Sequence, residues 1–362
     1  MTVRLAALST ALPPNVLPQD LVQRRAQALL GPRYPQFERM LSTFVTAGID
    51  TRYSVVPIDW FEQPAGWKER NDRFLEGGTA LFEDAATQAL AAAGWRADEV
   101  DVVVTVTSTG VATPTFEARA QRSMGFRGDA IRVPVFGLGC AGGVAGLGIA
   151  RDMAAARPGA KVLLVVVECC TLSFRTDRLQ KADIIATVLF GDGAAAACLS
   201  TTAKGAAIGQ GAQHLWPNTL GIMGWDVDDV GLGVVFDRSI PAFARKEFAN
   251  AVAAAAPGPF DRLVCHPGGT KVVEAIEGAM GLPDGALDAE RRVLRQCGNM
   301  SAPTALFVLK EALEGRAKGA GPGSETLLCA LGPGFTAAMV PVTLPTTYAK
   351  APGRAAEMVP AQ

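Results

Sequence analysis

The stretch VFGLGCAGGV, residues 135–144, contains the residue around which this chain is organised, Cys140. Four glycines surround this cysteine, between an apolar run that predicts a strand and an Ala/Gly-rich run that predicts a helix. Glycine allows a sharp turn and a close approach by another molecule, and a thiol at a helix start feels the positive end of the helix dipole. Both effects favour a nucleophilic thiolate. The alternative is a structural cysteine buried beside a tight turn.

Length and composition restrict the class of protein. A chain of 362 residues can form two domains or one large duplicated fold. About half of the residues are apolar (49%) and the net charge is −1, which argues against a nucleic acid or an anionic membrane as partner and favours small molecules. The longest apolar runs, such as residues 162–167, have the length of strands, so no membrane span is expected.

Two further features bear on the compartment. Residues 1–8 are too short an apolar run for a signal peptide and predict a first strand instead. The seven cysteines lie mostly in apolar segments and have the spacing of neither a disulfide framework nor a zinc site. We therefore expect reduced thiols, no bound metal and a cytoplasmic location.

The order of elements repeats along the chain. After a helix at residues 82–95 that Gly94 closes, the first half predicts a strand (100–107), a polar turn, a helix (116–124), the Cys140 turn with its helix to residue 156, and a strand (161–168). The second half predicts a strand (261–265), a turn (266–269), a helix (271–280), a turn (296–303) with a helix to about residue 314, and a strand (325–331).

This repetition indicates two copies of one βαβ-type unit, because roughly 40 residues separate the first strand from the second turn in both halves. Chance similarity among Ala- and Val-rich elements is the alternative. We expect a first half at residues 1–205, a second half at residues 206–345 and a tail at residues 346–362. Residues 15–75 predict helices and loops that decorate the core and cover a substrate.

The turn that contains Asn299 stands where the Cys140 turn stands in the first half, and the turn that contains His266 takes the place of the polar turn after the strand 100–107. The chain has two histidines, and His266 follows a buried strand and precedes Pro-Gly-Gly, whereas His214 lies in a loop without a partner motif. A nucleophilic cysteine needs a base or cationic partner, and His266 is the candidate. Asn299, in a turn, can donate to a developing oxyanion without titrating. Strand ends of a parallel sheet meet in one crevice, so we expect the three side chains together.

Five motifs in order carry a resemblance to a known family. GLGCAGG (137–143), LFGDGAAA (189–196), HPGG (266–269), GNMS (298–301) and GPGF (332–335) resemble the motif series of type III polyketide synthases, the chalcone synthase-like branch of the thiolase superfamily. The match extends from about Leu5 to Pro341. It implies a homodimer with an α/β, thiolase-like duplicated αβαβα five-layer fold. It also implies a catalytic triad of Cys140, His266 and Asn299, with Phe190 as an aromatic gate between the site and a CoA tunnel.

The resemblance further implies an acyltransferase reaction. Cys140 takes an acyl group from a starter acyl-CoA, and malonyl-CoA loses CO2 to give an enolate that His266 and Asn299 stabilise. The enolate attacks the Cys-bound acyl group, the cycle repeats and the chain cyclises. CoA thioesters are substrates and no cofactor is implied. The CAGG turn and MGWDV (223–227) resemble bacterial members that use fatty acyl starters, so we expect a medium- to long-chain starter and an alkylpyrone or alkylresorcinol product.

Further site residues are expected from the same resemblance. The substrate-binding candidates are Phe190, Ser108, Thr109, Thr113, Glu168, Cys170, Ser173, Gly231 and Ser301, of which Thr113 is the residue sent across the dimer into the partner's cavity. Arg39 and Lys271 are the candidates for CoA binding. Three other functions stay open: a ketoacyl synthase III-like enzyme that condenses once and uses an acyl carrier protein, a Cys/His hydrolase, and a binding protein without catalysis.

Overall fold

A mixed ten-stranded sheet forms the framework of the protein. The computed structural model describes residues 1–34, 36–178, 180–256 and 258–346, so the expected tail at 346–362 lies almost entirely outside the described residues. The strands of the large sheet are β1 (Val3–Ala11), β4 (Val102–Val106), β5 (Ile131–Val135), β6 (Val162–Cys169), β7 (Asp192–Ser200), β8 (Ala206–Ile208), β9 (Ala212–Leu215), β12 (Arg262–Cys265), β13 (Glu325–Gly332) and β14 (Thr336–Thr343). Two small sheets pair β2 (Asn15–Pro18) with β3 (Thr51–Ser54) and β10 (Met223–Val227) with β11 (Leu232–Phe236).

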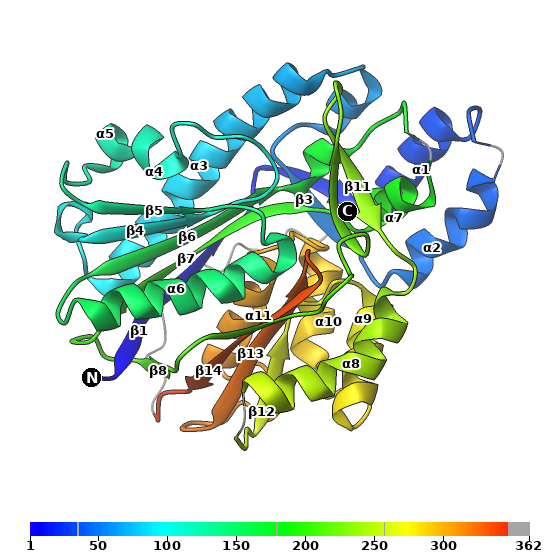
Figure 1. Ribbon diagram of the computed structural model, residues 1–362. Helices are drawn as coiled ribbons and strands as arrows, with labels where there is room; N and C mark the ends of the chain where they lie inside the picture. The colour runs from blue at the N-terminus through cyan, green and yellow to red at the C-terminus, as the bar shows by residue number, and fades with distance from the viewer. Residues whose placement is uncertain (35, 179, 257, 347–362) are drawn as a thin grey trace.

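The sheet consists of two halves. Its order is β12-β13-β14-β8-β1-β7-β6-β4-β5, and β9 pairs with β14. Within the first half β4 runs parallel to β5 and β6, and within the second half β12 runs parallel to β13. The short strand β8 joins the halves, because it pairs antiparallel with both β1 and β14. Figure 1 shows the two groups of strands on either side of α6.

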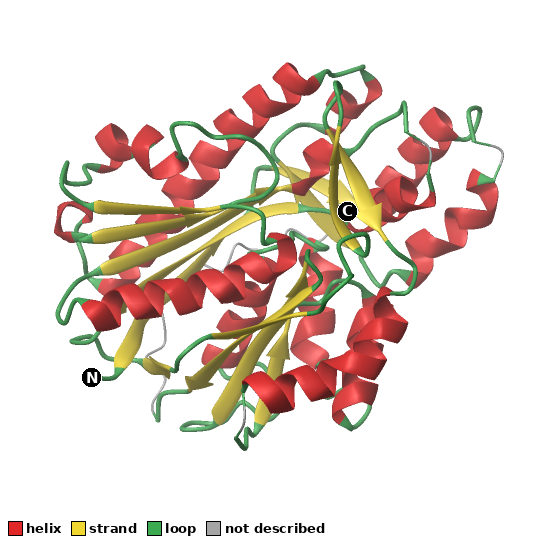
Figure 2. Ribbon diagram, viewed as in Figure 1, coloured by secondary structure: helices red, strands yellow, loops and turns green. Residues whose placement is uncertain are grey.

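Helices cover both outer faces and fill the space between the halves. They are α1 (Gln19–Leu30), α2 (Leu41–Thr46), α3 (Trp67–Ala93), α4 (Phe116–Arg119), α5 (Gln121–Met124), α6 (Gly142–Ala156), α7 (Lys181–Leu189), α8 (Ile240–Ala255), α9 (Thr270–Met280), α10 (Asp288–Cys297) and α11 (Thr304–Leu313), with 3-10 turns η1 (Phe37–Met40), η2 (Ile58–Glu62), η3 (Ala97–Glu99), η4 (Gly139–Ala141) and η5 (Cys170–Ser173). Figure 2 shows the helices and strands in separate layers.

The alternating direction of the side chains along each strand explains these layers. In β4, Val102, Val104 and Val106 face the central layer of α6 and α11, whereas Val103 faces α3. The same alternation in β13 sends Leu328 to the central layer and other residues toward α8 and α9. Side chains of a strand point alternately to opposite faces, so a strand covered on both faces is apolar throughout. The five-layer αβαβα fold expected from the sequence is confirmed.

The expected elements differ from the observed ones mainly at their ends. The helix expected at 82–95 begins already at Trp67 and runs through Gly77 and Gly78, which a sequence pattern treats as breakers. A side chain at 78 would place its Cβ 2.4 Å from the ring of Phe116, so close packing requires glycine here. The helix expected at 116–124 is divided into α4 and α5 at Ala120. No helix within the described ranges is long and apolar enough to cross a membrane.

Candidate active site

The Cys140 turn lies at the start of the central helix α6. Cys140 stands in η4, and Gly139 before it has a φ of +45°, a conformation that only glycine adopts readily. The end of β13 packs directly on this turn, since a Cβ at Gly332 would lie 2.6 Å from the Leu138 carbonyl oxygen. The Ser108 hydroxyl accepts a hydrogen bond from the Gly139 N–H at 3.2 Å. Contacts from both halves therefore hold the cysteine in place.

Asn299 joins the Cys140 turn to the turn that carries His266. Its side chain and that of Ser301 lie close enough to the Cys140 thiol to lower the pKa of Cys140. The Asn299 Nδ2 donates to the Gly268 carbonyl at 3.2 Å, and its Oδ1 accepts from the Ser301 N–H at 2.8 Å. The main chain of Asn299 pairs with the segment around Phe190. Asn299 therefore contacts both of the other candidate regions.

His266 is buried with a neutral ring. His266 follows β12, and its main-chain N–H donates to the Cys329 carbonyl of β13 at 3.0 Å. Neither ring nitrogen has a hydrogen-bond partner among the described residues, although only 4% of the residue is exposed. Burial lowers the pKa of His266 to about 3, because an imidazolium would lose its hydration there. A buried ring with free nitrogens is suited to binding a substrate atom.

Burial opposes ionisation of the Cys140 thiol. It raises the pKa of Cys140 to about 12, whereas hydrogen bonding to Ser301 and Asn299 lowers it. The helix dipole at the start of α6 and a cationic partner act against burial. The resting thiolate that the sequence favours therefore stays a prediction. From a thiol, the thiolate at Cys140 forms by proton transfer.

Glu168 forms a polar network beneath the cysteine. Its Oε2 accepts hydrogen bonds from the Ser108 N–H at 2.9 Å, the Thr109 hydroxyl at 2.8 Å and the Thr107 hydroxyl at 3.4 Å. Its Oε1 has no partner among the described residues. Burial raises the pKa of Glu168 to about 8. The carboxyl is therefore mostly protonated at neutral pH and can donate as well as accept.

A pocket of about 360 Å³, including its open mouth, adjoins Cys140. Its lining consists of Gly139, Cys140, Cys170, Phe190, Met223, Gly224, Trp225, Val234, Phe236, Ser301 and Pro333. Phe190 packs edge-on against Phe236 and Trp225, with ring centroids 5.5 and 6.2 Å apart. Arg52 donates to the Phe190 carbonyl at 2.8 Å and fixes its main chain. We call this space the catalytic pocket.

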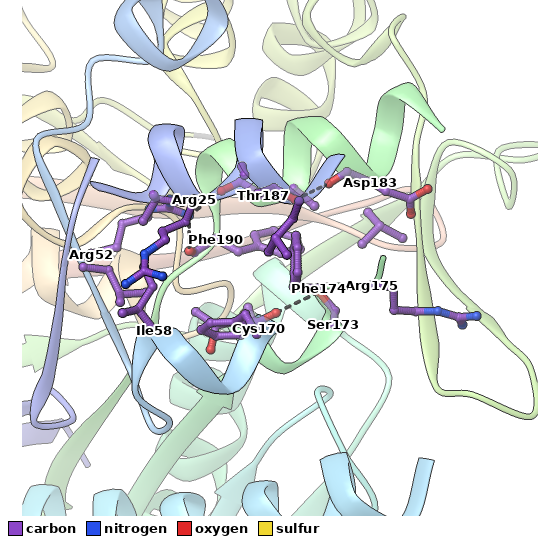
Figure 3. A pocket seen from close by; sticks show the side chains of 18 residues that line it. Arg25, Arg52, Ile58, Cys170, Ser173, Phe174, Arg175, Asp183, Thr187 and Phe190 are labelled. Atoms are coloured by element: carbon purple, nitrogen blue, oxygen red, sulfur yellow. Dashed lines mark hydrogen bonds between the residues drawn. The ribbon is translucent and has the colours of Figure 1, made fainter. Parts of the chain in front are cut away.

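A second pocket of about 630 Å³, including its open mouth, lies on the other side of Phe190 (Figure 3). Most of its lining is apolar: Leu17, Val22, Ala26, Leu29, Ile58, Phe61, Phe174, Ala186, Phe190 and Val234. Cys170, Phe190 and Val234 line both pockets. Arg25, Arg52 and Arg175 contribute the cationic part of the wall. We call this space the apolar pocket.

The other candidate residues are more widely distributed. Ser173 lines the apolar pocket, and its hydroxyl donates to the Cys170 carbonyl at 2.7 Å. Gly231 is buried against Trp67 and Arg70 and lines neither pocket. Thr113 lies on an exposed loop after β4. Four substrate-binding candidates therefore line one or both pockets: Phe190, Cys170, Ser173 and Ser301. Ser108, Thr109 and Glu168 form the polar network beside Cys140, and Thr113 and Gly231 lie apart from both groups.

The two CoA-binding candidates are exposed. Arg39 is in η1, and Lys271 is the second residue of α9. The two segments adjoin, because the Thr270 hydroxyl donates to the Ala47 carbonyl just after α2 at 2.7 Å. Neither residue lines the catalytic or the apolar pocket. Within the described ranges, no group of three or more His, Cys, Asp or Glu residues is arranged to hold a metal ion.

Sequence reasoning missed the outer walls of both pockets. Trp225, Val234 and Phe236 come from the β10–β11 hairpin, and Val22, Ala26 and Leu29 come from α1. A signal for the α1 wall is present, since these three residues have the i, i+4, i+7 spacing of an apolar helix face. The sequence of the β10–β11 hairpin gives no comparable apolar periodicity, because each of its strands has only five residues and an exposed turn separates them.

Comparisons with known proteins agree with the fold. Residues 2–203 match the N-terminal domain of chalcone and stilbene synthases, and residues 207–344 match their C-terminal domain. The 1,3,6,8-tetrahydroxynaphthalene synthase of Streptomyces peucetius subsp. caesius is 38% identical over 93% of this chain and 92% of that protein. The phloroglucinol synthase of Pseudomonas fluorescens is 25% identical over 85% of this chain and 89% of that protein.

A solved structure gives the same assignment. The 1,3,6,8-tetrahydroxynaphthalene synthase of Streptomyces coelicolor A3(2), a bacterial type III polyketide synthase, superposes with a TM-score of 0.88 at 25% identity, covering 95% of this chain and all of that one. A duplicated thiolase-like fold with a buried cysteine at the start of its central helix defines a condensing acyltransferase. The chain belongs to the chalcone and stilbene synthase family and is a type III polyketide synthase.

Proposed function

We propose that this enzyme extends a medium- or long-chain fatty acyl-CoA with malonyl-CoA and cyclises the product to an alkylpyrone or an alkylresorcinol. The observation that carries the starter assignment is the apolar pocket behind Phe190, because an alkyl chain needs an apolar space beside the nucleophile. We do not retain the alternatives of a ketoacyl synthase III-like enzyme and a Cys/His hydrolase, because the chain belongs to the chalcone and stilbene synthase family.

The proposed reaction begins with a proton transfer inside the catalytic pocket. Cys140 is a thiol and His266 a neutral imidazole, so His266 accepts the thiol proton as the sulfur attacks the acyl-CoA carbonyl. The C–S bond to CoA breaks, and the CoA sulfur leaves with the proton from His266. The acyl group remains as a thioester on Cys140, and the imidazole is neutral again.

The extension step uses His266 and Asn299 as donors. In malonyl-CoA the bond to the carboxylate breaks, CO2 leaves, and the electron pair forms an enolate whose oxygen accepts hydrogen bonds from both side chains. The enolate carbon attacks the thioester on Cys140, a C–C bond forms, and the cysteine sulfur leaves. Return of the β-ketoacyl chain from CoA to Cys140 allows the next extension. Buried donors are strong here, because no water competes with them.

The acyl chain extends from Cys140 past Phe190 into the apolar pocket. Cys170, Phe190 and Val234 form the boundary of the two pockets, so a chain attached to Cys140 has to pass these side chains. Most of the side chains that line this pocket are apolar, which suits an alkyl chain. Burial of each methylene contributes about 0.8 kcal/mol, which favours long starters over short ones until the pocket is full.

The test combines a substrate series with a filled pocket. The purified enzyme is incubated with malonyl-CoA and acyl-CoAs of increasing length, and the products are identified by mass spectrometry. Ala26 is buried in the pocket wall and Ala28 is exposed on the same helix, so Ala26→Trp is paired with Ala28→Trp. We expect Ala26→Trp to shift the preference to shorter starters and Ala28→Trp to leave it unchanged.

Two outcomes contradict this proposal. Turnover with aromatic starters alone removes the fatty acyl assignment. Turnover with malonyl-CoA alone assigns instead an oligoketide synthase, the activity suggested by the names of the tetrahydroxynaphthalene synthases and the phloroglucinol synthase. An unchanged chain-length preference in Ala26→Trp removes the apolar pocket from the starter site.

We also propose a homodimer, supported by the edge strand β5. No other described strand pairs with its outer edge, and apolar side chains are exposed along this side: Ile131, Phe136 and Val111. Such an edge is a template for pairing with another chain. Sedimentation velocity on the wild type and on Phe136→Lys tests the proposal, and a monomeric wild type contradicts it.

A further inference from the structure

The β10–β11 hairpin is a separate part of the pocket walls. It forms its own two-stranded sheet and is not hydrogen bonded to the large sheet. It nevertheless supplies Met223, Trp225 and Phe236 to the catalytic pocket and Val234 to both pockets. An isolated two-stranded hairpin is marginally stable, so the groups that hold the hairpin determine its position. The shape of both pockets therefore depends on these attachments.

In the middle of β10, the hairpin is fastened by Trp225. Its indole N–H donates to the Ser108 carbonyl at 2.8 Å, and its ring packs against Phe190. Ser108 belongs to the hydrogen-bond network of Glu168. The centre of the hairpin is therefore tied to the polar floor of the catalytic pocket.

At the turn, the hairpin is fastened by Asp228. One oxygen of its carboxylate, Oδ1, accepts three hydrogen bonds: from the Val230 N–H at 2.9 Å, from the Gly231 N–H at 3.1 Å and from the Arg175 Nη1 at 2.6 Å. The first two shape the turn, and the third attaches it to the segment after η5. The hydrogen bond from Arg175 is the main reason why the pKa of Asp228 falls to about 2. The same carboxylate thus forms the turn and holds it in place.

Arg175 is a buried residue of the apolar pocket. Its side chain is 3% exposed and it lines that pocket. Its Nε donates to Asp177 on its own segment at 2.9 Å, so Asp228 is its partner on the hairpin. The Asp228 side chain is 39% exposed, so the pair joins a buried guanidinium of the pocket wall to a carboxylate at the surface. A charge-assisted bond with one buried partner is stronger than a bond between two exposed groups.

A neighbouring pair reinforces this contact. The Arg178 Nη1 donates to Asp226 of β10 at 2.9 Å. The Arg178 guanidinium lies over Gly233 of β11, where a Cβ would be only 2.0 Å from Nη1. A glycine at 233 is needed for this approach. Asp226 is 63% exposed in its side chain and Asp228 39%, so this pair contributes less than the Arg175–Asp228 pair.

We propose that the Asp228–Arg175 ion pair determines acyl-chain specificity, because it sets the distance between the β10–β11 hairpin and the apolar pocket. The inference rests on the proposed function for the identity of the chain. Asp228 does not touch the reacting atoms and acts as a positioning residue through Val234 and Phe236. When the pair is lost, Arg175 keeps Asp177 but no longer holds the turn, so the hairpin moves outward and both pockets widen.

The chain offers a matched control for this pair. Asp228→Asn removes the charge and keeps an oxygen that can accept from Val230 and Gly231. Asp229→Asn removes the same charge one residue away, where the carboxylate is exposed and has no ion pair within the described part of the chain. Any difference between the variants therefore reports the charge of Asp228 toward Arg175 and toward Arg178, whose Nη1 lies 4.0 Å from the Asp228 Oδ2, and not the net charge of the turn.

Three measurements are made on both full-length variants and the wild type. They are the rate of malonyl-CoA decarboxylation, the amide hydrogen exchange of residues 223–236, and the products from the acyl-CoA series. For Asp228→Asn we expect decarboxylation within about twofold of wild type, hairpin exchange faster by about tenfold or more, and a shift to longer starters. For Asp229→Asn we expect no change in any of the three.

The outcomes are distinguishable from failure of the proposed function. If Asp228→Asn exchanges faster but keeps the product profile of Asp229→Asn, the ion pair only fastens the hairpin and the specificity proposal is overturned. If the wild type uses malonyl-CoA alone, the fatty acyl proposal fails, and the number of extensions becomes the readout. A changed number in Asp228→Asn then supports the role of the pair, and an unchanged number overturns it.

Discussion

The candidate catalytic residues and the pocket walls are held by different kinds of contact. His266 and Asn299 are fixed by main-chain hydrogen bonds to Cys329 and Leu189, and the Cys140 turn is packed between the halves of the sheet. The hairpin wall is held by side chains, through Trp225 and Asp228. Main-chain pairing within the core changes little when a side chain is substituted. This difference lets the reaction stay constant while the pocket changes.

The largest effect is expected where the core-held nucleophile is removed. Cys140→Ala leaves no thiol to hold the acyl group, so we expect condensation to fall by about 10³-fold or more. His266 and Asn299 are untouched, and decarboxylation of malonyl-CoA should continue. Product formation and CO2 release are measured in parallel. Condensation at the wild-type rate in this variant would remove Cys140 from the mechanism.

The next largest effect concerns the two donors to the enolate. His266→Ala and Asn299→Ala each remove one hydrogen bond to the enolate oxygen, so we expect decarboxylation of malonyl-CoA to fall by about 10²–10³-fold. Transfer of the acyl group to Cys140 depends on proton transfer to His266, so Asn299→Ala should still be acylated. Mass spectrometry of the intact protein detects this acylation. Wild-type decarboxylation in Asn299→Ala excludes Asn299 from the reaction.

The core-held region, which consists of Cys140, His266 and Asn299 and the turns that carry them, is also the part that the sequence predicts well. Cys140, His266 and Asn299 each stand where an apolar strand or a helix ends beside glycine, and that local pattern determines the place of the residue in a duplicated α/β sheet. Their protonation states are a different matter. The pKa of Cys140 depends on burial and on Ser301 and Glu168, which are distant in sequence, so the local argument from the helix start covers only part of the balance.

The β10–β11 hairpin, which side chains hold in place, is the part that the sequence predicts poorly. Arg175 and Asp228 are 53 residues apart, and nothing in either neighbourhood indicates that they pair. The start of α3 was missed for a similar reason, because Gly77 and Gly78 are explained by contacts with Val55 and Phe116 from other segments. Local patterns predict elements and strand ends, whereas the partners of long charged side chains depend on the assembled fold.

A smaller effect, on stability, tests how the polar floor of the core-held region titrates. The folded state keeps a proton on Glu168 up to a pKa of about 8, whereas the unfolded chain releases it near 4.5. Its contribution to stability is complete below pH 4.5 and is lost as the pH rises through 8. Glu168→Gln does not titrate, so between pH 6 and 8 its unfolding free energy should rise relative to wild type by about 1 kcal/mol per pH unit at most.

Glu117 provides the matched control for this titration. It is also a buried glutamate, but hydrogen bonds from Thr115, Thr105 and Arg132 outweigh desolvation and lower its pKa. Its contribution is present above pH 4.5 and lost only as the pH falls below that value. The difference between Glu117→Gln and wild type should therefore stay constant from pH 6 to 8. Urea denaturation at several pH values measures both variants, and parallel curves for wild type and Glu168→Gln would contradict the raised pKa.

The smallest effect is expected at the exposed basic residues Arg39 and Lys271. If they bind the CoA phosphates, each exposed ion pair contributes about 1 kcal/mol at most, so Arg39→Ala and Lys271→Ala should raise KM for malonyl-CoA by about fivefold with kcat unchanged. Both effects should diminish with added salt. Lys246→Ala on α8 removes an exposed lysine from another helix and serves as the control. A KM equal to that of the control would exclude the pair from CoA binding, whereas a fall in kcat would show that this exposed region also shapes the core-held site.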